Sequence, residues 1–261
     1  MNDAQKTIQL LNEGFAGLEG CSALAVSGSR TSLINDGSSD WDLYIYYDRH
    51  ITREEREKII LPIAEEARID ASFFEEGDEF AKDGITYDLM YRPVSFANEQ
   101  IDRVWVKHIP SLGYSTCFLY NLRTSSFLFD KAGLKEQTAV LDQPYPEALK
   151  DSIISYNRRM MSGDGEATWL KQLELAVRRK DFVSRCHRLA ALMASYFDML
   201  FAYNRVLHPG GKKLIGYAHA LCPLLPEDFD ADMKDIYSKV YDGDLLSAVN
   251  TALEHLYSMT G

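Results

Sequence analysis

The stretch that decides the fold, residues 23–48, reads ALAVSGSRTSLINDGSSDWDLYIYYD. Its two apolar runs, residues 22–28 and 42–48, are typical of short β-strands. Two acids, Asp40 and Asp42, stand at the start of the second run. Because side chains alternate along a strand, both project from one face, where neighbouring carboxylates repel unless a cation lies between them. The pattern therefore predicts a site for Mg²⁺, which binds one or two carboxylates and completes its shell with water and phosphate oxygens.

A glycine and a serine close the first of these runs. Gly28 and Ser29 lie where a glycine lets a phosphate approach the backbone and the next residues present N–H groups to it. Strand, Gly-Ser, turn and a strand that opens with Asp-x-Asp together predict an anion-binding turn beside a metal site. The residues leave an alternative open, because Ser38, Ser39 and Asp40 also have the composition of a turn that caps the next element.

A third acid lies in a later apolar run. Asp88 stands within residues 83–91, DGITYDLMY, where an unpaired charge is costly and a cation or hydrogen-bond donor is expected. An edge-strand aspartate that points into solvent is the alternative. With Asp40 and Asp42, Asp88 predicts a three-carboxylate arrangement in which two metal ions bind nucleotide phosphates and activate an attacking hydroxyl.

The order and spacing of these residues resemble a known superfamily. The motif of the polymerase-beta-like nucleotidyltransferases is matched by Gly28-Ser29, Asp40-x-Asp42 and Asp88 on a later strand. The superfamily includes the bacterial two-domain aminoglycoside and lincosamide nucleotidyltransferases, in which a helical domain follows a small catalytic domain. The resemblance of the motif covers roughly residues 20 to 92.

The resemblance implies a role for each residue of the motif. Binding of the triphosphate of ATP or another NTP is implied for Gly28, Ser29 and Ser39. Binding of Mg²⁺, with two ions expected, is implied for Asp40 and Asp42. Asp88 is then expected to complete the second metal site or to act as the base toward the acceptor hydroxyl.

Periodicity along the rest of the chain predicts an α+β fold. The first part alternates helix with strand, and its expected elements are helices over residues 3–19 and 52–67 and further strands over 68–74 and 85–92. After residue 144 only helical periods follow, over residues 145–161, 167–181, 182–207 and 245–259. We therefore expect a nucleotidyltransferase domain at 1–140, a small mixed sheet flanked by helices, and a C-terminal α-helical bundle at 141–261.

Two basic segments of the helical part are candidates for binding the leaving phosphates. Arg185 belongs to a run of cations over residues 178–188, and solvated charge paired with Asp181 is its alternative reading. Lys212 and Lys213 follow a Pro-Gly-Gly break that either forms a phosphate-binding loop or ends a helix.

Other polar residues of the chain carry weaker signals. His187 and His208 have no partner at metal-ligand spacing and are expected to pack or to cap helices. An acidic segment is expected to form a loop that contacts a cationic acceptor, supplies a base or is simply solvated: Glu75, Glu76, Asp78 and Glu79.

Composition limits the class of partner. The 39 acidic against 28 basic residues give a net charge of −11, which disfavours a broad nucleic-acid or anionic-membrane surface. Four scattered cysteines and the lack of a secretory pattern at the N-terminus predict a cytoplasmic protein.

The expected function is Mg²⁺-dependent transfer of NMP, with AMP from ATP favoured, to a hydroxyl of a small acceptor such as an aminoglycoside-like antibiotic. The NTP is expected to bind between the two domains. Modification of a protein or tRNA, and a non-catalytic nucleotide-binding module, remain as alternatives.

Overall fold

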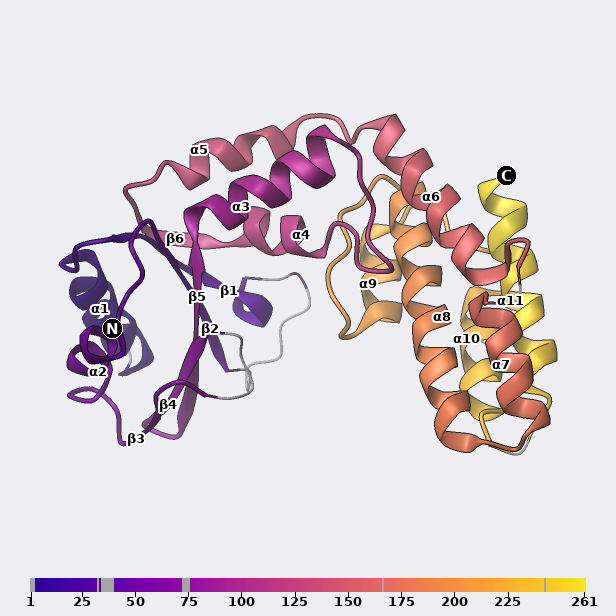
Figure 1. Ribbon diagram of the computed structural model, residues 1–261, viewed down its shortest axis with the longest axis horizontal. Coiled ribbons are helices and arrows are strands. Elements are labelled where there is room, and N and C mark those ends of the chain that lie inside the picture. Colours follow the sequence, from indigo (N-terminus) through magenta and orange to yellow (C-terminus); the bar gives the residue numbers. More distant parts are fainter. Residues whose placement is uncertain (1–2, 32, 34–39, 72–75, 166, 242) are drawn as a thin grey trace. The chain divides into compact units, whose positions relative to one another are not determined.

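The chain forms two compact units in the computed structural model (Figure 1). The structure describes residues 3–31, 33, 40–71, 76–165, 167–241 and 243–261. The first unit contains residues 1–102 and 121–143, and the second contains residues 103–120 and 144–261. Each unit is described here by itself.

A six-stranded mixed sheet, counted over the described residues, is the centre of the first unit. Its strand order is β3-β4-β5-β2-β1-β6. The pair β2 and β5 is parallel, and all other neighbours are antiparallel. The strands are β1 Cys21–Ser27, β2 Trp41–Tyr47, β3 Glu66–Arg68, β4 Gly77–Lys82, β5 Ile85–Pro93 and β6 Ser126–Asp130.

Short helices connect and cover these strands. Helix α1 has an amphipathic pattern whose buried side chains recur three or four positions apart, and α2 begins at a capping box between Thr52 and Glu55. The helices that contribute to this unit are α1 Asp3–Ala16, α2 Arg53–Ile60, α3 Val94–Gln100, α4 Cys117–Thr124, which also extends into the second unit, and α5 Leu134–Thr138. A π-helical turn follows α3 (Ile101–Val106), and 3₁₀ turns lie at Gly28–Arg30 and Ala139–Asp142.

The two faces of the sheet differ in what covers them. One face packs against α1 and α2, as Figure 1 shows, and its core includes Leu11, Phe15, Leu24, Leu43, Ile45, Ile60, Phe80, Tyr87, Leu89 and Tyr91. Alternate residues of β2 and β5 project from the opposite face. Among these, Asp42, Tyr44 and Asp88 are half-buried. This opposite face therefore carries the polar side chains of the central strands.

The predicted helix 52–67 is wrong in its second half. Helix α2 ends at Ile60, and residues 66–68 form β3, which pairs with β4. Pro62 explains the early end, because proline lacks the N–H that a continued helix needs and its ring clashes with the preceding turn. The predicted strand 68–74 overlaps β3 only at Arg68, and its residues 72–74 lie outside the described part of the chain.

The second unit is helical throughout its described residues. Its helices are α6 Glu147–Ser162, α7 Trp169–Arg178, α8 Phe182–Tyr203, α9 Leu214–Leu221, α10 Phe229–Ser238 and α11 Leu245–Thr260. Helix α8 is the central helix, because almost all side chains of its C-terminal half are buried. No described helix combines the length and the apolar character that crossing a membrane demands. At this coarse level the α+β prediction is confirmed: a mixed sheet with helices is followed by helices alone.

A buried carboxylate joins α6, α8 and the segment before α4. Asp198 accepts hydrogen bonds from the Ser115 hydroxyl (2.7 Å), the Ser115 N–H (2.9 Å) and the Asn157 amide (2.8 Å). Burial raises the pKa of Asp198 to about 6, although these hydrogen bonds act in the opposite direction. The segment over residues 111–116 is thus attached to the helices by one acid with neutral partners.

Candidate functional site

Four polar residues lie in one row across the sheet. The register pairs Ser27 of β1 with Asp42 of β2, Asp42 with Asp88 of β5, and Asp88 with Glu79 of β4. Residues that pair directly across neighbouring strands project from the same face, and the strands are about 4.8 Å apart. Two half-buried carboxylates, those of Asp42 and Asp88, are therefore direct neighbours on the face opposite α1 and α2. The structure thus brings together two of the three acids that the sequence analysis singled out.

Gly28 makes room for the Asp42 carboxylate. Its φ is +66°, in the left-handed region that glycine adopts without strain. A Cβ atom added to Gly28 would lie 1.9 Å from Asp42 Oδ2 and 2.6 Å from Asp42 Cγ. The backbone of the turn Gly28–Arg30 therefore lies directly against the carboxylate, at a distance that no other residue allows.

The same turn begins a short polar segment. Ser29 is its middle residue, and the guanidinium of Arg30 lies 4.9 Å from the centre of the Trp41 ring. Thr31 closes the turn, since its N–H donates to the Gly28 carbonyl at 3.3 Å. Gly28 and Ser29 thus belong to one backbone turn next to the Asp42 carboxylate, and anion binding by this turn stays a prediction.

The structure describes one of the two remaining residues of the predicted motif. Asp40 is exposed and directly precedes β2. Ser39 lies outside the described residues. Among the described residues, no group of three or more His, Cys, Asp or Glu side chains is arranged to hold a metal ion. Of the three predicted metal ligands, the sheet register thus places Asp42 and Asp88 side by side.

Sequence reasoning missed the serine at the end of β1. Ser27 is fully buried, and the Ser125 hydroxyl lies 3.1 Å from the Ser27 hydroxyl and 2.8 Å from the Asn121 carbonyl. The contact connects the end of β1 to the end of α4. Its signal in the sequence is a second serine on the N-terminal side of Gly28, which the motif does not require.

The predicted acidic loop is wrong for two of its members, because Asp78 and Glu79 belong to β4. Glu79 shares the face of Asp88 and forms an ion pair with Arg68 at 3.2 Å. Glu76 accepts a hydrogen bond from the Tyr47 hydroxyl at 3.0 Å. Glu75 lies outside the described residues. The alternation of apolar and polar residues that would have revealed β4 is short, and it contains only one large apolar residue, Phe80.

Asp78 lies on the core face and has structural partners there. Its Oδ1 accepts from Arg56 Nη1 (2.9 Å) and from the Asp70 N–H (2.9 Å), and its Oδ2 accepts from the Tyr91 hydroxyl (2.7 Å). Burial raises the pKa of Asp78, against the effect of these donors. Asp78 therefore holds β4 to α2 and β5 and takes no part in the row.

The basic candidates lie in the second unit. Arg185 is buried, and its Nη1 donates to the carbonyls of Val240 (2.8 Å) and Tyr241 (3.2 Å). Lys212 and Lys213 are exposed just before α9, and Lys213 has a φ of +55°. Arg185 thus stabilises the packing of α8, and its phosphate-binding role stays a prediction.

His208, expected to pack or to cap, is fully buried between the rings of Tyr114 and Phe201, whose centres are 4.8 Å and 5.0 Å away. Its Nδ1 accepts from the Gly210 N–H at 3.1 Å, and burial lowers its pKa to about 3. The ring is therefore neutral and packed in the core of the second unit.

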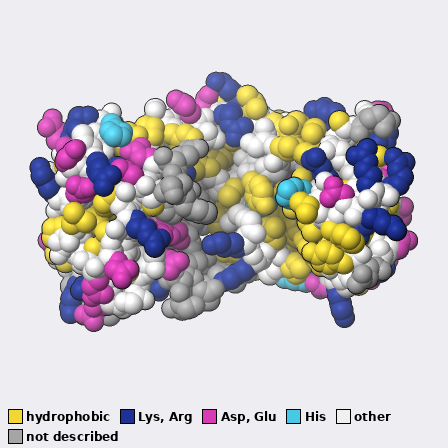
Figure 2. Space-filling view, turned by 60° about the horizontal axis from the view of Figure 1, so that its bottom comes forward, with side chains coloured by type: hydrophobic (Ala, Val, Ile, Leu, Met, Phe, Trp, Pro, Cys, Tyr) yellow, Lys and Arg dark blue, Asp and Glu magenta, His cyan; other side chains and the backbone are white. Residues whose placement is uncertain are grey.

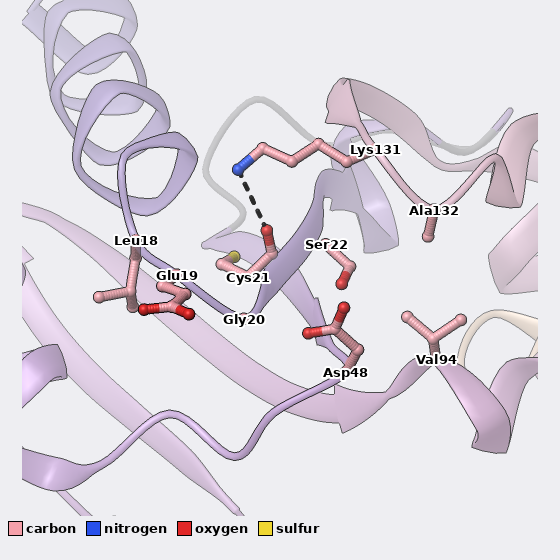
Figure 3. Close-up of a pocket in the computed structure, with 9 residues that line it drawn as sticks. All are labelled: Leu18, Glu19, Gly20, Cys21, Ser22, Asp48, Val94, Lys131 and Ala132. Atoms are coloured by element: carbon pink, nitrogen blue, oxygen red, sulfur yellow. Dashed lines mark hydrogen bonds between the residues drawn. The ribbon is translucent and has the colours of Figure 1, made fainter.

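A pocket of about 310 Å³ lies at the other end of β1, away from Ser27 (Figure 3). Lys131 extends over it, and its ammonium donates to the carbonyls of Ala16 (2.7 Å) and Cys21 (3.3 Å). The carboxylate of Asp48 points toward the Ser22 hydroxyl. Because Lys131 binds the protein's own carbonyl oxygens, this pocket has a structural cation and stands apart from the acidic row.

Comparison with known proteins assigns the chain to no family. No family model matches the chain, and no curated protein matches its sequence. Among solved structures, a nucleotidyltransferase-like protein from Exiguobacterium sibiricum is similar, with a TM-score of 0.46 and 9% identity over 99% of this chain and 74% of that chain. A structural similarity this low carries no functional argument, so any functional proposal depends on the geometry of the site.

Proposed function

We propose that the chain is a Mg²⁺-dependent nucleotidyltransferase that transfers NMP from an NTP, with ATP favoured, to a hydroxyl of a small acceptor such as an aminoglycoside-like molecule. The observation that supports the proposal is the close placement of Gly28, Asp42 and Asp88 on one face of the sheet. The turn lies directly against one carboxylate, and the second carboxylate is its neighbour in the adjacent parallel strand.

The residues fit a magnesium ion bound together with a nucleotide. Asp42 and Asp88 are half-buried carboxylates, the ligand type that Mg²⁺ prefers, and Asp40 is near enough in sequence to add a third. When bound, the ion would neutralise phosphate charge and polarise the phosphorus that is attacked. The missing ligands of its octahedral shell would be water and phosphate oxygens, as is usual for this metal.

The chain's own groups have defined tasks in the proposed reaction. N–H groups of the turn Gly28–Arg30 orient the phosphates. The acceptor hydroxyl loses its proton to a carboxylate base, which is Asp88 where Asp40 and Asp42 hold the ion, and its oxygen forms a bond to the α-phosphorus. The bond from that phosphorus to the oxygen bridging the α- and β-phosphates breaks, and pyrophosphate leaves with the electron pair.

Transfer of label tests the proposal. The full chain is incubated with α-³²P-labelled NTPs, Mg²⁺ and a panel of aminoglycosides, lincosamides, tRNA and proteins. We expect label on a small hydroxylated acceptor, and a loss on the order of 10³-fold in Asp42→Asn and Asp88→Asn. Asp48→Asn is the matched control, because Asp48 is exposed just beyond the other end of β2, and it should keep full activity.

Thermal unfolding supplies a second readout for nucleotide binding. An NTP with Mg²⁺ should raise the melting temperature of the wild type, and the rise should be lost in Asp42→Asn. Label transfer that survives both substitutions would refute the assignment of the site. Failure of every NTP to stabilise the chain in the presence of Mg²⁺ would refute nucleotide binding at the row.

A further inference from the structure

The second unit contains a pocket of about 320 Å³ at the beginning of α9. Its volume lies at the lower end of the range for small-molecule sites. All lining residues belong to this unit, and they come from α8, the segment before α9, the first turn of α9, and α10: Phe197, Gly211, Lys213, Leu214, Ile215, Gly216 and Tyr237.

One part of the pocket is aromatic and aliphatic. Phe197 is only 2% exposed, and its ring is held by Tyr196 and Phe229, with centres 5.5 Å and 6.2 Å away. Tyr237 and Ile215 are exposed at the same pocket. Since Phe197 is fixed by its neighbours, the pocket has a firm apolar wall that binds apolar atoms without reordering.

The other part of the pocket favours an anion. Lys213 lines it and precedes the first turn of α9, whose N–H groups have no partner within the helix. In this fully described segment no side chain caps that helix end. The lining residues include no Asp or Glu, in a chain whose net charge is −11.

Two glycines of the lining, Gly211 and Gly216, add no side chain to the pocket. A Cβ atom added to Gly211 would meet the Tyr114 hydroxyl at 3.4 Å, and Gly216 adds no side chain to the first turn of α9. Figure 2 shows hydrophobic and Lys or Arg side chains next to one another on the viewed face of the helical unit. Apolar and cationic groups thus coexist on this unit as they do in the pocket.

We propose that this pocket binds a small molecule in which an aromatic body carries an anionic group. The aromatic body would contact Ile215 and Tyr237, whose side chains are exposed at the pocket, and the anion would meet Lys213 and the first turn of α9. Two sources share this chemistry, an aromatic carboxylate and a nucleotide. The proposal stands independently of nucleotidyl transfer at Asp42 and Asp88.

Matched ligands test the proposal by calorimetric titration of the full chain. The probes are 2-naphthoate and the neutral alcohol 2-naphthalenemethanol, which have the same ring system. We expect naphthoate to bind at least 10-fold more tightly than the alcohol, because a hydrogen bond to a charged group is stronger than one between neutral groups. Equal affinity of the two probes, or no binding of naphthoate, would overturn the proposal.

Neighbouring lysines provide a matched pair of variants. Lys213→Asn keeps the left-handed backbone, which asparagine tolerates, and removes the charge that lines the pocket. We expect it to weaken naphthoate binding about 10-fold, whereas Lys212→Asn and Asp42→Asn should change it less than twofold. Equal losses in the two lysine variants would contradict the assignment of Lys213.

Ile215→Asp is a second variant, and it leaves the left-handed backbone at Lys213 untouched. It places a carboxylate at the rim of the pocket and should also weaken naphthoate binding, because like charges repel.

Competition by AMP then distinguishes the two sources of the ligand, a nucleotide and another aromatic anion. Displacement of naphthoate by AMP identifies a nucleotide site, and failure of AMP to displace it identifies a site for another aromatic anion. Both results support the pocket, and unchanged binding in Ile215→Asp would refute its location.

Discussion

Asp78 and Asp88 lie on neighbouring strands of one sheet and have opposite surroundings. Asp78 of β4 projects into the core, where Arg56, Tyr91 and a backbone N–H satisfy its carboxylate. Asp88 of β5 projects from the other face, where its neighbour in the sheet is another carboxylate, Asp42. The side of the strand thus decides whether the acid lies among hydrogen-bond donors of the core or beside another carboxylate of the sheet.

Removal of the two carboxylates tests this difference most strongly. Asp78→Ala leaves the buried guanidinium of Arg56 without its core partner and should lower the free energy of unfolding by about 3–5 kcal/mol. Asp88→Ala, the matched change on the other face, should lower it by less than Asp78→Ala does, because Asp88 is only half-buried and its removal also relieves repulsion from Asp42. Urea denaturation at pH 7 measures both, and equal losses would contradict the assignment of the two faces.

A third buried acid, Asp198, sharpens the comparison because its partners are neutral. Between pH values of about 4 and 6 the folded chain holds a proton on Asp198 that the unfolded chain has released. The contribution of Asp198 to stability is therefore complete below about pH 4 and falls, by at most about 3 kcal/mol, as the pH rises through about 6. The opposite contribution comes from His208, whose lowered pKa favours folding as the pH rises.

Asp198→Asn isolates this dependence. The free energy of unfolding is measured at several pH values between about 4 and 6.5 for the wild type and the variant. Because His208 is present in both, its contribution cancels, and the advantage of the wild type over the variant should shrink as the pH rises. Parallel curves for the two proteins would show that Asp198 does not titrate in this range.

The smallest expected effect concerns Gly28, and Gly84 is its control. Both glycines have positive φ, but a Cβ atom at Gly84 meets nothing within 4 Å, whereas at Gly28 it meets Asp42. Gly84→Ala should cost about 1 kcal/mol from backbone strain alone. Gly28→Ala should cost about 1–2 kcal/mol more and should also reduce nucleotidyl transfer, because Asp42 must move. Equal unfolding free energies for the two variants would show that the contact between Gly28 and Asp42 is not tight.

The parts of the fold with clear periodicity could be predicted from the sequence. Strands β1, β2 and β5 are apolar runs, and their order along the chain places Gly28 and Asp42 in one motif. Strands β3 and β4 escaped prediction because they are short and polar, and so the buried role of Asp78 was missed. The pairing of Asp42 with Asp88 depends on sheet register, which a local pattern does not contain.

In the helical unit, the long amphipathic helices α6, α8 and α11 follow from their period. The sequence also drew attention to the segment around Lys213. The sequence did not reveal the neighbours of Lys213 in space, because Phe197 and Tyr237 belong to helices that are distant from it in the chain. A cation expected to hold phosphate in a loop proved to line a largely apolar pocket.

The parallel pairing of β2 with β5 also determines when the two carboxylates meet during folding. The strands are separated by α2, β3 and β4, so their contact closes a long loop. Chain entropy is lost in closing this loop before the contacts between the strands contribute to stability. Antiparallel neighbours such as β4 and β5 are joined by a tight turn and form with little loss of chain freedom. The acidic pair therefore assembles only once β2 and β5 have paired, and a partly folded chain without this contact lacks the proposed site.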